Sequence, residues 1–270
     1  NLNGHIISHI SSGHYMWLGY FFLPLFFLFI FELLEKGNTA ILPIKLSFVL
    51  FAIFLQGSFH IYVWCLIFMV LLMIFSRKYL KPISLAILFS FLLLSFRLFP
   101  AFITYWDQLY THTRGYFSIQ NLLESLIIIK DAFYKVSGGY YGWCEYNMYI
   151  DILGLGIIAY FGVYFIFKKL PELKSLDYPE LNAPILVMSI LSMSRIYWII
   201  TRLPIPLLNS ENVVTRFIII PILSLLIISV ARMEKLLYKI KDNITVKLLS
   251  IFGIIMLFSS LKTHLNVWKV

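Results

Sequence analysis

The sequence predicts an all-α polytopic transmembrane helix bundle with about eight spans. Hydrophobic residues make up 60% of the 270 residues and charged residues only 13%, whereas soluble domains carry about a quarter charged residues. The apolar residues gather into stretches that approach the roughly 20 residues needed to cross a bilayer. Basic residues cluster between these stretches, so the net charge of +9 indicates membrane topology rather than nucleic-acid binding. We expect membrane lipid as a partner and no nucleic acid.

Eight apolar stretches are candidate spans. Gln56, Gly57 and Ser58 separate the second from the third, and together these two are too long for one crossing at about 1.5 Å per residue. We therefore favour a tight helical hairpin over one broken helix. Pro24 predicts a kink in the first span, and the sixth span is polar for its kind. The stretches are residues 15–34, 41–55, 59–75, 82–99, 149–167, 184–200, 213–231 and 246–261.

Lysine and arginine predict the orientation of these spans. With eight crossings, the basic clusters at 36–45, 77–81, 168–174 and 232–247 fall on one side, which the positive-inside rule assigns to the cytoplasm. Both termini and all six histidines then lie at the outer face or at the outer ends of spans. We expect an integral, multi-pass protein of a prokaryotic cell membrane, with its termini extracytoplasmic and its titratable chemistry outside.

The longest outer segment covers residues 100–148. Apolar and polar residues interleave over 119–135, which predicts a helix lying in the plane of the membrane interface. In this topology Cys65 and Cys144 lie at different depths, so we expect two free thiols. The sequence starts with Asn1 rather than Met, and its first residues contain no basic region or cleavage site. We interpret residues 1–270 as a single transmembrane domain that lacks its N-terminal part.

Residues 138–151 are the stretch best suited to bind a polar ligand. They combine glycines and aromatic rings with two carboxylates, Glu145 and Asp151. Trp143 and Tyr146 can stack on a sugar ring or a lipid headgroup, and the carboxylates can act as acid, base or hydrogen-bond acceptor. The alternative is an aromatic belt at the membrane interface.

Two histidine positions are further candidates. His5 and His9 are four residues apart, so a helix would place them on one face, as in many zinc sites. The pattern HExxH is absent, so we favour interfacial histidines and expect no metal or other cofactor, with a divalent ion as the alternative. His60 follows the predicted hairpin turn and would face outward. A turn that needs only glycine and polar caps explains this region equally, and we favour it.

Arginines near the outer surface are the last candidates. Arg97 lies at the outer end of the fourth span, where it either faces a cavity or extends to the interface. Arg195, Arg202 and Arg216 can grip a phosphate through forked contacts. The alternative is a bridge between Glu211 and Arg216 with the other arginines as interface anchors.

Short elements spread over most of the chain occur in a recognisable order. They are Gly13-His14-x-x-Trp17, Gln56-Gly57-Ser58-Phe59-His60, Arg97-Leu98-x-Pro100, Gly142-Trp143-x-Glu145-Tyr146-x-x-Tyr149-Ile150, Leu203-Pro204 and Glu211-x-Val213-x-x-Arg216-Phe217. In this order they resemble the YfhO-like and C-superfamily polytopic membrane glycosyltransferases of bacteria and archaea.

The resemblance implies transfer of a sugar from a lipid-phosphate carrier on the extracytoplasmic side. It also implies that the catalytic acidic residue lies in an earlier outer loop, so the catalytic residue stays unassigned and Glu145 is only an auxiliary candidate. The implied carrier or acceptor cavity would contain His60, Arg97, Trp143, Glu145, Tyr146, Arg202 and Arg216.

Three functions follow from these expectations. The first is a membrane glycosyltransferase that uses a lipid-linked saccharide. The second is a lipid or polysaccharide transporter, similar to a flippase, that performs no chemistry. The third is a structural subunit of a larger membrane complex.

Overall fold

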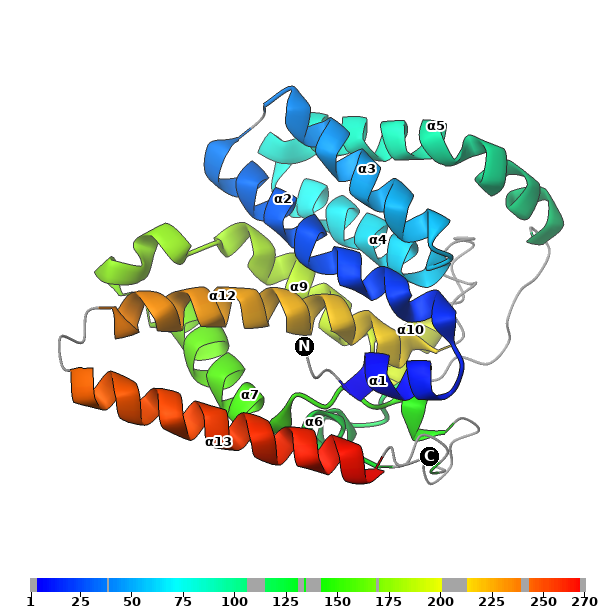
Figure 1. The fold of residues 1–270 in the computed structure, drawn as a ribbon. Coiled ribbons are helices and arrows are strands. Elements are labelled where there is room, and N and C mark those ends of the chain that lie inside the picture. The colour runs from blue at the N-terminus through cyan, green and yellow to red at the C-terminus, as the bar shows by residue number, and fades with distance from the viewer. Residues whose placement is uncertain are drawn as a thin grey trace. The chain divides into compact units, whose positions relative to one another are not determined.

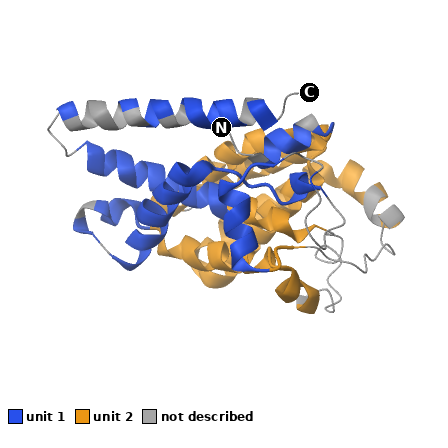
Figure 2. Cartoon of the chain, turned by 90° about the horizontal axis from the view of Figure 1, so that it is seen from below, with its two compact units in different colours: residues 1–13, 118–177, 221–270 blue, residues 14–117, 178–220 orange. Residues whose placement is uncertain are grey.

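A computed structural model describes residues 4–37, 39–105, 115–130, 134, 142–168, 170–200, 213–238 and 243–267. The regular structure of these residues is helical, with one isolated bridge between Tyr116 and Met193 (Figure 1). The chain divides into two compact units. Unit 1 contains residues 1–13, 118–177 and 221–270, and unit 2 contains residues 14–117 and 178–220 (Figure 2).

Unit 2 contains a set of strongly apolar helices. Pro24 lies in the first turn of α2, where its missing N–H is not needed and its fixed φ suits a helix start. The predicted kink at Pro24 is therefore replaced by a change from 3-10 to α-helical geometry. The helices are η1 (Tyr15–Phe22), α2 (Leu23–Lys36), α3 (Ile41–Leu55), α4 (Phe59–Phe75), η2 (Arg77–Tyr79), α5 (Leu80–Tyr105), α9 (Pro179–Leu191), α10 (Ser194–Ile200) and η6 (Val214–Ile218).

The turn between α3 and α4 forms a hairpin, as the sequence predicts (Figure 1). Gly57 has φ of +100°, in the left-handed region that glycine adopts without strain. The residues on either side fasten the turn to η1. Gln56 Nε2 donates to the carbonyl oxygen of Tyr15 at 3.2 Å, and the amide of Gly19 donates to Ser58 Oγ at 3.0 Å. Glycine thus permits the turn, whereas the polar side chains beside it bond to η1 rather than capping α3 and α4.

The sixth predicted span, residues 184–200, consists of two helices. α9 ends at Leu191 and α10 begins at Ser194. The amide of Tyr116 donates to the carbonyl oxygen of Ser192 at 3.0 Å, and the carbonyl oxygen of Tyr116 accepts from the amide of Ser194 at 3.1 Å. The prediction of one continuous helix is wrong here because a segment distant in sequence binds these backbone groups.

Unit 1 combines short helices with two long ones. Ser118 caps α6 by accepting from the amide of Asn121 at 3.2 Å, which is a typical N-cap contact. The helix ends at Ile127 because Ile128 is extended, so the predicted helix over 119–135 is too long. The helices are α1 (Gly4–Ser11), α6 (Ile119–Ile127), η3 (Trp143–Glu145), α7 (Asp151–Ile157), η4 (Ile158–Tyr164), α8 (Phe165–Phe167), η5 (Pro171–Leu176), most of α12 (Ile219–Leu237) and α13 (Asn243–Val267).

Arg232 of α12 ties several of these elements together and is only 3% exposed. Its Nη1 donates to the carbonyl oxygens of Phe161 and Gly162 at 3.0 and 3.1 Å, and its Nε donates to that of Leu176 at 3.2 Å. Its Nη2 lies 3.7 Å from Asp177 Oδ1. Phe161 and Gly162 belong to η4, a π-helical segment. Such segments are rare and shift carbonyls out of the α-helical pattern, which suits them to accept from an inserted side chain.

Three helices are long and apolar enough to cross a membrane, at residues 15–36, 77–100 and 214–237. Large apolar side chains such as Phe48 and Phe96 are exposed on the helix surfaces, as expected of a protein that contacts lipid. The protein is therefore all-helical and membrane-associated, and the count of eight crossings stays a prediction. Cys65 and Cys144 are free and buried, which confirms the expected thiols. Shorter apolar helices cover residues 41–55, 59–75, 151–167, 179–191 and 253–263.

Candidate functional site

The predicted site residues fall into both units. Trp143, Glu145 and Tyr146 belong to unit 1, whereas Arg97 lies in unit 2 with His60 and Arg216. Arg202 and Glu211 lie outside the described residues, as do residues 138–141 of the candidate stretch. We describe the two groups separately.

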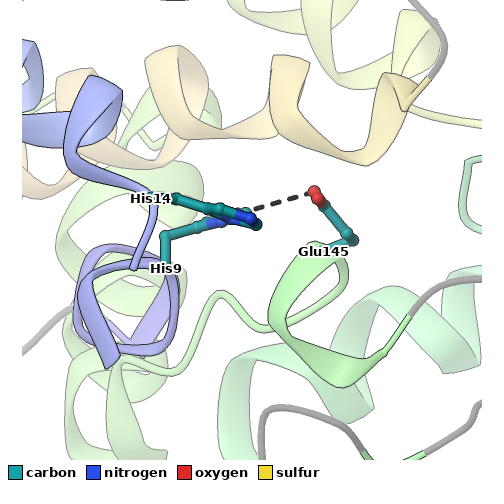
Figure 3. Close-up of side chains that lie close together, drawn as sticks. All are labelled: His9, His14 and Glu145. Atoms are coloured by element: carbon teal, nitrogen blue, oxygen red, sulfur yellow. Dashed lines mark ion pairs between the residues drawn. The ribbon is translucent and has the colours of Figure 1, made fainter. Parts of the chain in front are cut away.

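Unit 1 contains a buried polar group that we call the Glu145 cluster, made of His5, His9, Trp143, Glu145 and Asn147. α1 supplies the histidines and packs against η3, which supplies Glu145. Nε2 of His9 lies 3.5 Å from Oε2 of Glu145. The His9 imidazole and the Glu145 carboxylate point toward each other (Figure 3). The rings of His5 and His9 meet edge to face, with centroids 4.3 Å apart. His14, also drawn in Figure 3, is the first residue of unit 2.

Backbone contacts on both sides hold Glu145 in this position. The amides of Tyr146 and Asn147 both donate to the carbonyl oxygen of Trp143, at 2.9 and 2.8 Å. Further along, the amide of Met148 donates to the carbonyl oxygen of Ser125 at 3.0 Å. The chain therefore turns tightly at η3 and is then fastened to the C-terminal end of α6, which leaves the Glu145 side chain facing α1.

Two buried donors of the cluster have no hydrogen-bond partner among the described residues. They are Nε1 of Trp143 and Nδ2 of Asn147. The amide of Tyr149 donates to Oδ1 of Asn147 at 3.0 Å, which defines the orientation of the Asn147 side chain. A buried polar group that lacks a partner costs about 1–3 kcal/mol. These two N–H groups are therefore suited to donate to an oxygen atom that the described residues do not provide.

A lysine lies over the aromatic rings of the same region. Nζ of Lys130 is 4.5 Å from the ring centroid of Trp143 and 4.3 Å from that of Tyr134. Cation–π contacts of this kind stabilise by about 0.5–2 kcal/mol. Lys130 thus contacts the ring of Trp143, whose indole N–H is buried. The stacking role that the sequence suggested for Trp143 stays a prediction.

Both members of the His9–Glu145 pair are buried, which makes each depend on a polar partner. His9 is fully buried and Glu145 is 5% exposed. Moving a charged group from water into the protein interior costs roughly several kcal/mol, and a close partner of opposite charge is needed to offset that cost. An imidazole and a carboxylate at this separation can share one proton, which is the property that general acid–base chemistry requires.

The structure bears on both expectations for the histidines. Their spacing of four residues predicts a shared helix face, and the 4.3 Å between the His5 and His9 rings confirms that they share one. Both side chains are fully buried within the protein, and the favoured interpretation of both as residues at the membrane interface stays a prediction. Asn147 was not predicted at all. Its position two residues after Glu145 in a tight turn is the only signal that the sequence offers.

Unit 2 contains an aromatic group that we call the Trp17 cluster, made of Trp17, His60, Trp64, Arg216 and Phe217. The ring of Trp17 stacks on His60 with centroids 6.2 Å apart and contacts Trp64 at 5.6 Å. Cζ of Arg216 lies 4.9 Å from the Trp17 ring centroid, and Trp64 contacts Phe217 at 6.1 Å. The fold thus brings together two predicted residues, His60 and Arg216, through a tryptophan that we did not predict as part of the site.

Arg97 does not join the Trp17 cluster through any contact in the described residues. Its Nη1 donates to the carbonyl oxygen of Leu55 at 3.4 Å, and its Cζ lies 6.0 Å from the ring centroid of Phe54. Leu55 is the last residue of α3, where a cation is favourable beside the free carbonyl groups. This contact gives Arg97 a structural role at the end of α3, without a ligand.

Comparison of the chain with protein-family models, with curated proteins and with solved structures finds no match. Assignment of function therefore rests on the two clusters and on the membrane character of the helices.

Proposed function

We propose that this protein is a multi-pass membrane glycosyltransferase that takes a sugar from a lipid-phosphate carrier on the extracytoplasmic side. The observation that supports this most is the Glu145 cluster. It contains a buried carboxylate–imidazole pair. Trp143 and Asn147, each two residues from Glu145 in the chain, carry buried N–H donors that lack partners in the described residues. A saccharide supplies the complementary groups, because each hydroxyl can both donate and accept.

In this proposal Glu145 acts on the acceptor hydroxyl. Its carboxylate takes the hydroxyl proton while the acceptor oxygen bonds to the anomeric carbon and the bond from that carbon to the carrier phosphate breaks. His9, 3.5 Å away, is a positioning residue that holds the carboxylate and stabilises its charge. Nε1 of Trp143 and Nδ2 of Asn147 donate to sugar oxygens. A base of this kind typically contributes about 10²–10⁴-fold to the rate.

Arg216 has a separate role in the proposal. A guanidinium binds phosphate through two parallel N–H contacts, and stacking on Trp17 at 4.9 Å restrains its side chain. We assign Arg216 to the carrier phosphate, with His60 and Trp64 restraining the Trp17 ring through their own ring contacts. The same cluster would serve a transporter that binds the carrier without breaking a bond.

The test is a transfer assay with the protein in nanodiscs and a panel of polyprenyl-phosphate sugars. We expect Glu145→Gln to lower transfer at least about 100-fold, as for loss of a general base, while binding of the donor is retained. Glu124→Gln is the matched control, since Glu124 is a carboxylate of α6 in the same unit and contacts only Gln120 in the described structure. Full transfer by Glu145→Gln would remove the proposed role, and carrier binding by wild type without transfer would favour the transporter.

A second variant separates binding from folding. Replacing Trp143 by its benzothiophene analogue, in which a sulfur atom stands in place of the indole N–H, removes the donor and keeps the bicyclic ring under Lys130. Deleting a buried donor that has no partner among the described residues should leave the melting temperature unchanged or raise it, while the affinity for saccharide falls about fivefold or more, as for one lost hydrogen bond. A lower melting temperature with unchanged affinity would instead show that Nε1 of Trp143 has a structural partner.

A further inference from the structure

We propose that a groove between α2 and α3 binds the acyl chain of an anionic phospholipid, with the lipid phosphate at Lys36 and Lys45. This site is independent of sugar transfer and lies wholly within unit 2. The groove has a volume of about 390 Å³. Its walls are apolar except at Lys45, and they include Leu25 and Phe29 of α2 and Ile41, Phe48 and Ala52 of α3.

The dimensions of the groove suit one acyl chain. The lining residues of α3 run from Ile41 to Ala52, a rise of roughly 16 Å at about 1.5 Å per residue. Half of a bilayer core is about 15 Å thick, so the groove has the length of one leaflet. Side chains on its rim are exposed, with Phe48 at 55% and Ile41 at 56%. Each methylene buried there would contribute to binding in the same way as a buried lipid anchor.

The charges at one end of the groove select the headgroup. Glu32 accepts from Lys36 and from Lys45, each at 3.1 Å. Two cations share one carboxylate, so this trio carries one unbalanced positive charge. Nζ of Lys45 also lies 5.2 Å from the Phe29 ring centroid, which places it at the groove wall. The neighbouring carboxylate of Glu35 accepts from the Tyr178 hydroxyl at 2.6 Å.

An anionic lipid completes this arrangement. Its phosphate would meet Lys45, the charged residue among those that line the groove, while its acyl chain lies along the apolar wall. A neutral chain without a phosphate would fill the groove but leave the trio unbalanced. Basic side chains near an anionic lipid surface each favour binding, and the groove adds the apolar contact that holds a particular lipid there.

The experiment is a lipid titration of the full chain by native mass spectrometry, with phosphatidylglycerol and phosphatidylcholine as the two probes. We expect the wild type to bind phosphatidylglycerol more tightly. Lys45→Gln should weaken that binding about fivefold, the loss expected for one lysine. Lys81→Gln, a lysine at the start of α5 outside the groove, should leave it unchanged. Equal binding of the two lipids by wild type would overturn the proposal.

Two further variants move the affinity in opposite directions. Ala52→Phe fills the groove and should weaken binding of both lipids. Glu32→Gln removes the carboxylate that competes for both lysines and should strengthen binding of phosphatidylglycerol alone. Unchanged affinity in Ala52→Phe, with the melting temperature of the wild type, would show that the acyl chain lies elsewhere. Weaker phosphatidylglycerol binding in Glu32→Gln would show that the trio does not serve the headgroup.

Discussion

The interiors of the two units differ in the polar groups they bury. Among the described residues, the buried polar side chains of unit 2 are all hydroxyls of serine or threonine. Several of them bond to nearby backbone, as Ser47 and Ser90 do to carbonyl oxygens three residues earlier. Unit 1 buries two histidines, an asparagine, a glutamate and an arginine as well.

The difference separates two ways of stabilising a membrane-associated helical unit. A hydroxyl that bonds to its own helix can be buried in apolar surroundings at little cost. An ionisable group needs a specific partner, and inside a membrane protein it indicates a functional site. Unit 2 thus resembles an apolar scaffold with an arginine and aromatic rings at one place, whereas unit 1 buries ionisable side chains in its core.

The largest effect is expected from removing the buried guanidinium of Arg232 in unit 1. Arg232→Met should lower the free energy of unfolding by about 3–5 kcal/mol, because it removes one partner of a buried charge pair and the donors to three carbonyl oxygens. Unfolding in mixed micelles followed by circular dichroism measures this change.

Lys235→Met provides the control for Arg232. Lys235 lies on the same helix and contacts the Ser175 side chain at an exposed position, so its loss should change stability by less than about 1 kcal/mol. If the two variants unfold alike, the buried guanidinium is not what stabilises unit 1.

An intermediate effect is expected from steric change in unit 2. The amide of Gly19 bonds to Ser58 Oγ, and a Cβ at Gly19 would overlap the Ser58 side chain. Gly19→Ala should therefore lower the free energy of unfolding by about 1–3 kcal/mol, as overpacking does. Thermal unfolding in detergent measures it.

The matched control for Gly19 is Gly156→Ala in α7. A Cβ at Gly156 meets no atom within 4 Å, and alanine favours helix by about 0.5–1 kcal/mol over glycine. The two substitutions should thus shift the melting temperature in opposite directions. Equal shifts would mean that close contact at Gly19 does not limit the packing of η1 against the hairpin turn.

The smallest expected effect concerns a hydroxyl pair in unit 2. Oη of Tyr62 lies 3.3 Å from Oγ of Ser90, and Ser90 also donates to the carbonyl oxygen of Ile87. Tyr62→Phe should cost only about 0.5–1 kcal/mol, since Ser90 keeps its backbone partner. Tyr160→Phe, at an exposed ring of unit 1, should cost nothing measurable in the same thermal assay. A loss at Tyr62 as large as that at Arg232 would contradict the contrast between the units.

The sequence predicts the helices of this protein better than their ends. Apolar stretches locate the helical segments, and Gly57 with its polar neighbours locates the hairpin turn. The break between α9 and α10 is not predictable from local residues, because Tyr116 supplies the backbone partners of Ser192 and Ser194. The end of α6 at Ile127 is likewise not predictable, because the alternation of apolar and polar residues continues past this residue.

The candidate site was predicted in part for a related reason. Trp143, Glu145 and Tyr146 lie together because they are neighbours in a glycine-rich stretch. The burial of His5 and His9 depends on a segment more than 130 residues further along the chain, so local hydropathy assigned them to the interface. Arg216 was predicted from its chemistry, but its ring partner Trp17 becomes apparent only from the fold.

The π-helical segment at residues 158–164 has a consequence for the tolerance of this chain to insertions and deletions. A π-turn accommodates one residue more than an α-turn, so deleting a single residue there would restore regular α-helix without altering the hydrophobic composition. Because the π-turn absorbs the extra residue, the flanking helical segments would keep nearly the same orientation after the deletion. The widened turn itself would close and withdraw the carbonyl groups of Phe161 and Gly162 from Arg232. The spacing between residue 151 and residue 167 is therefore constrained in length by the contacts of one buried arginine.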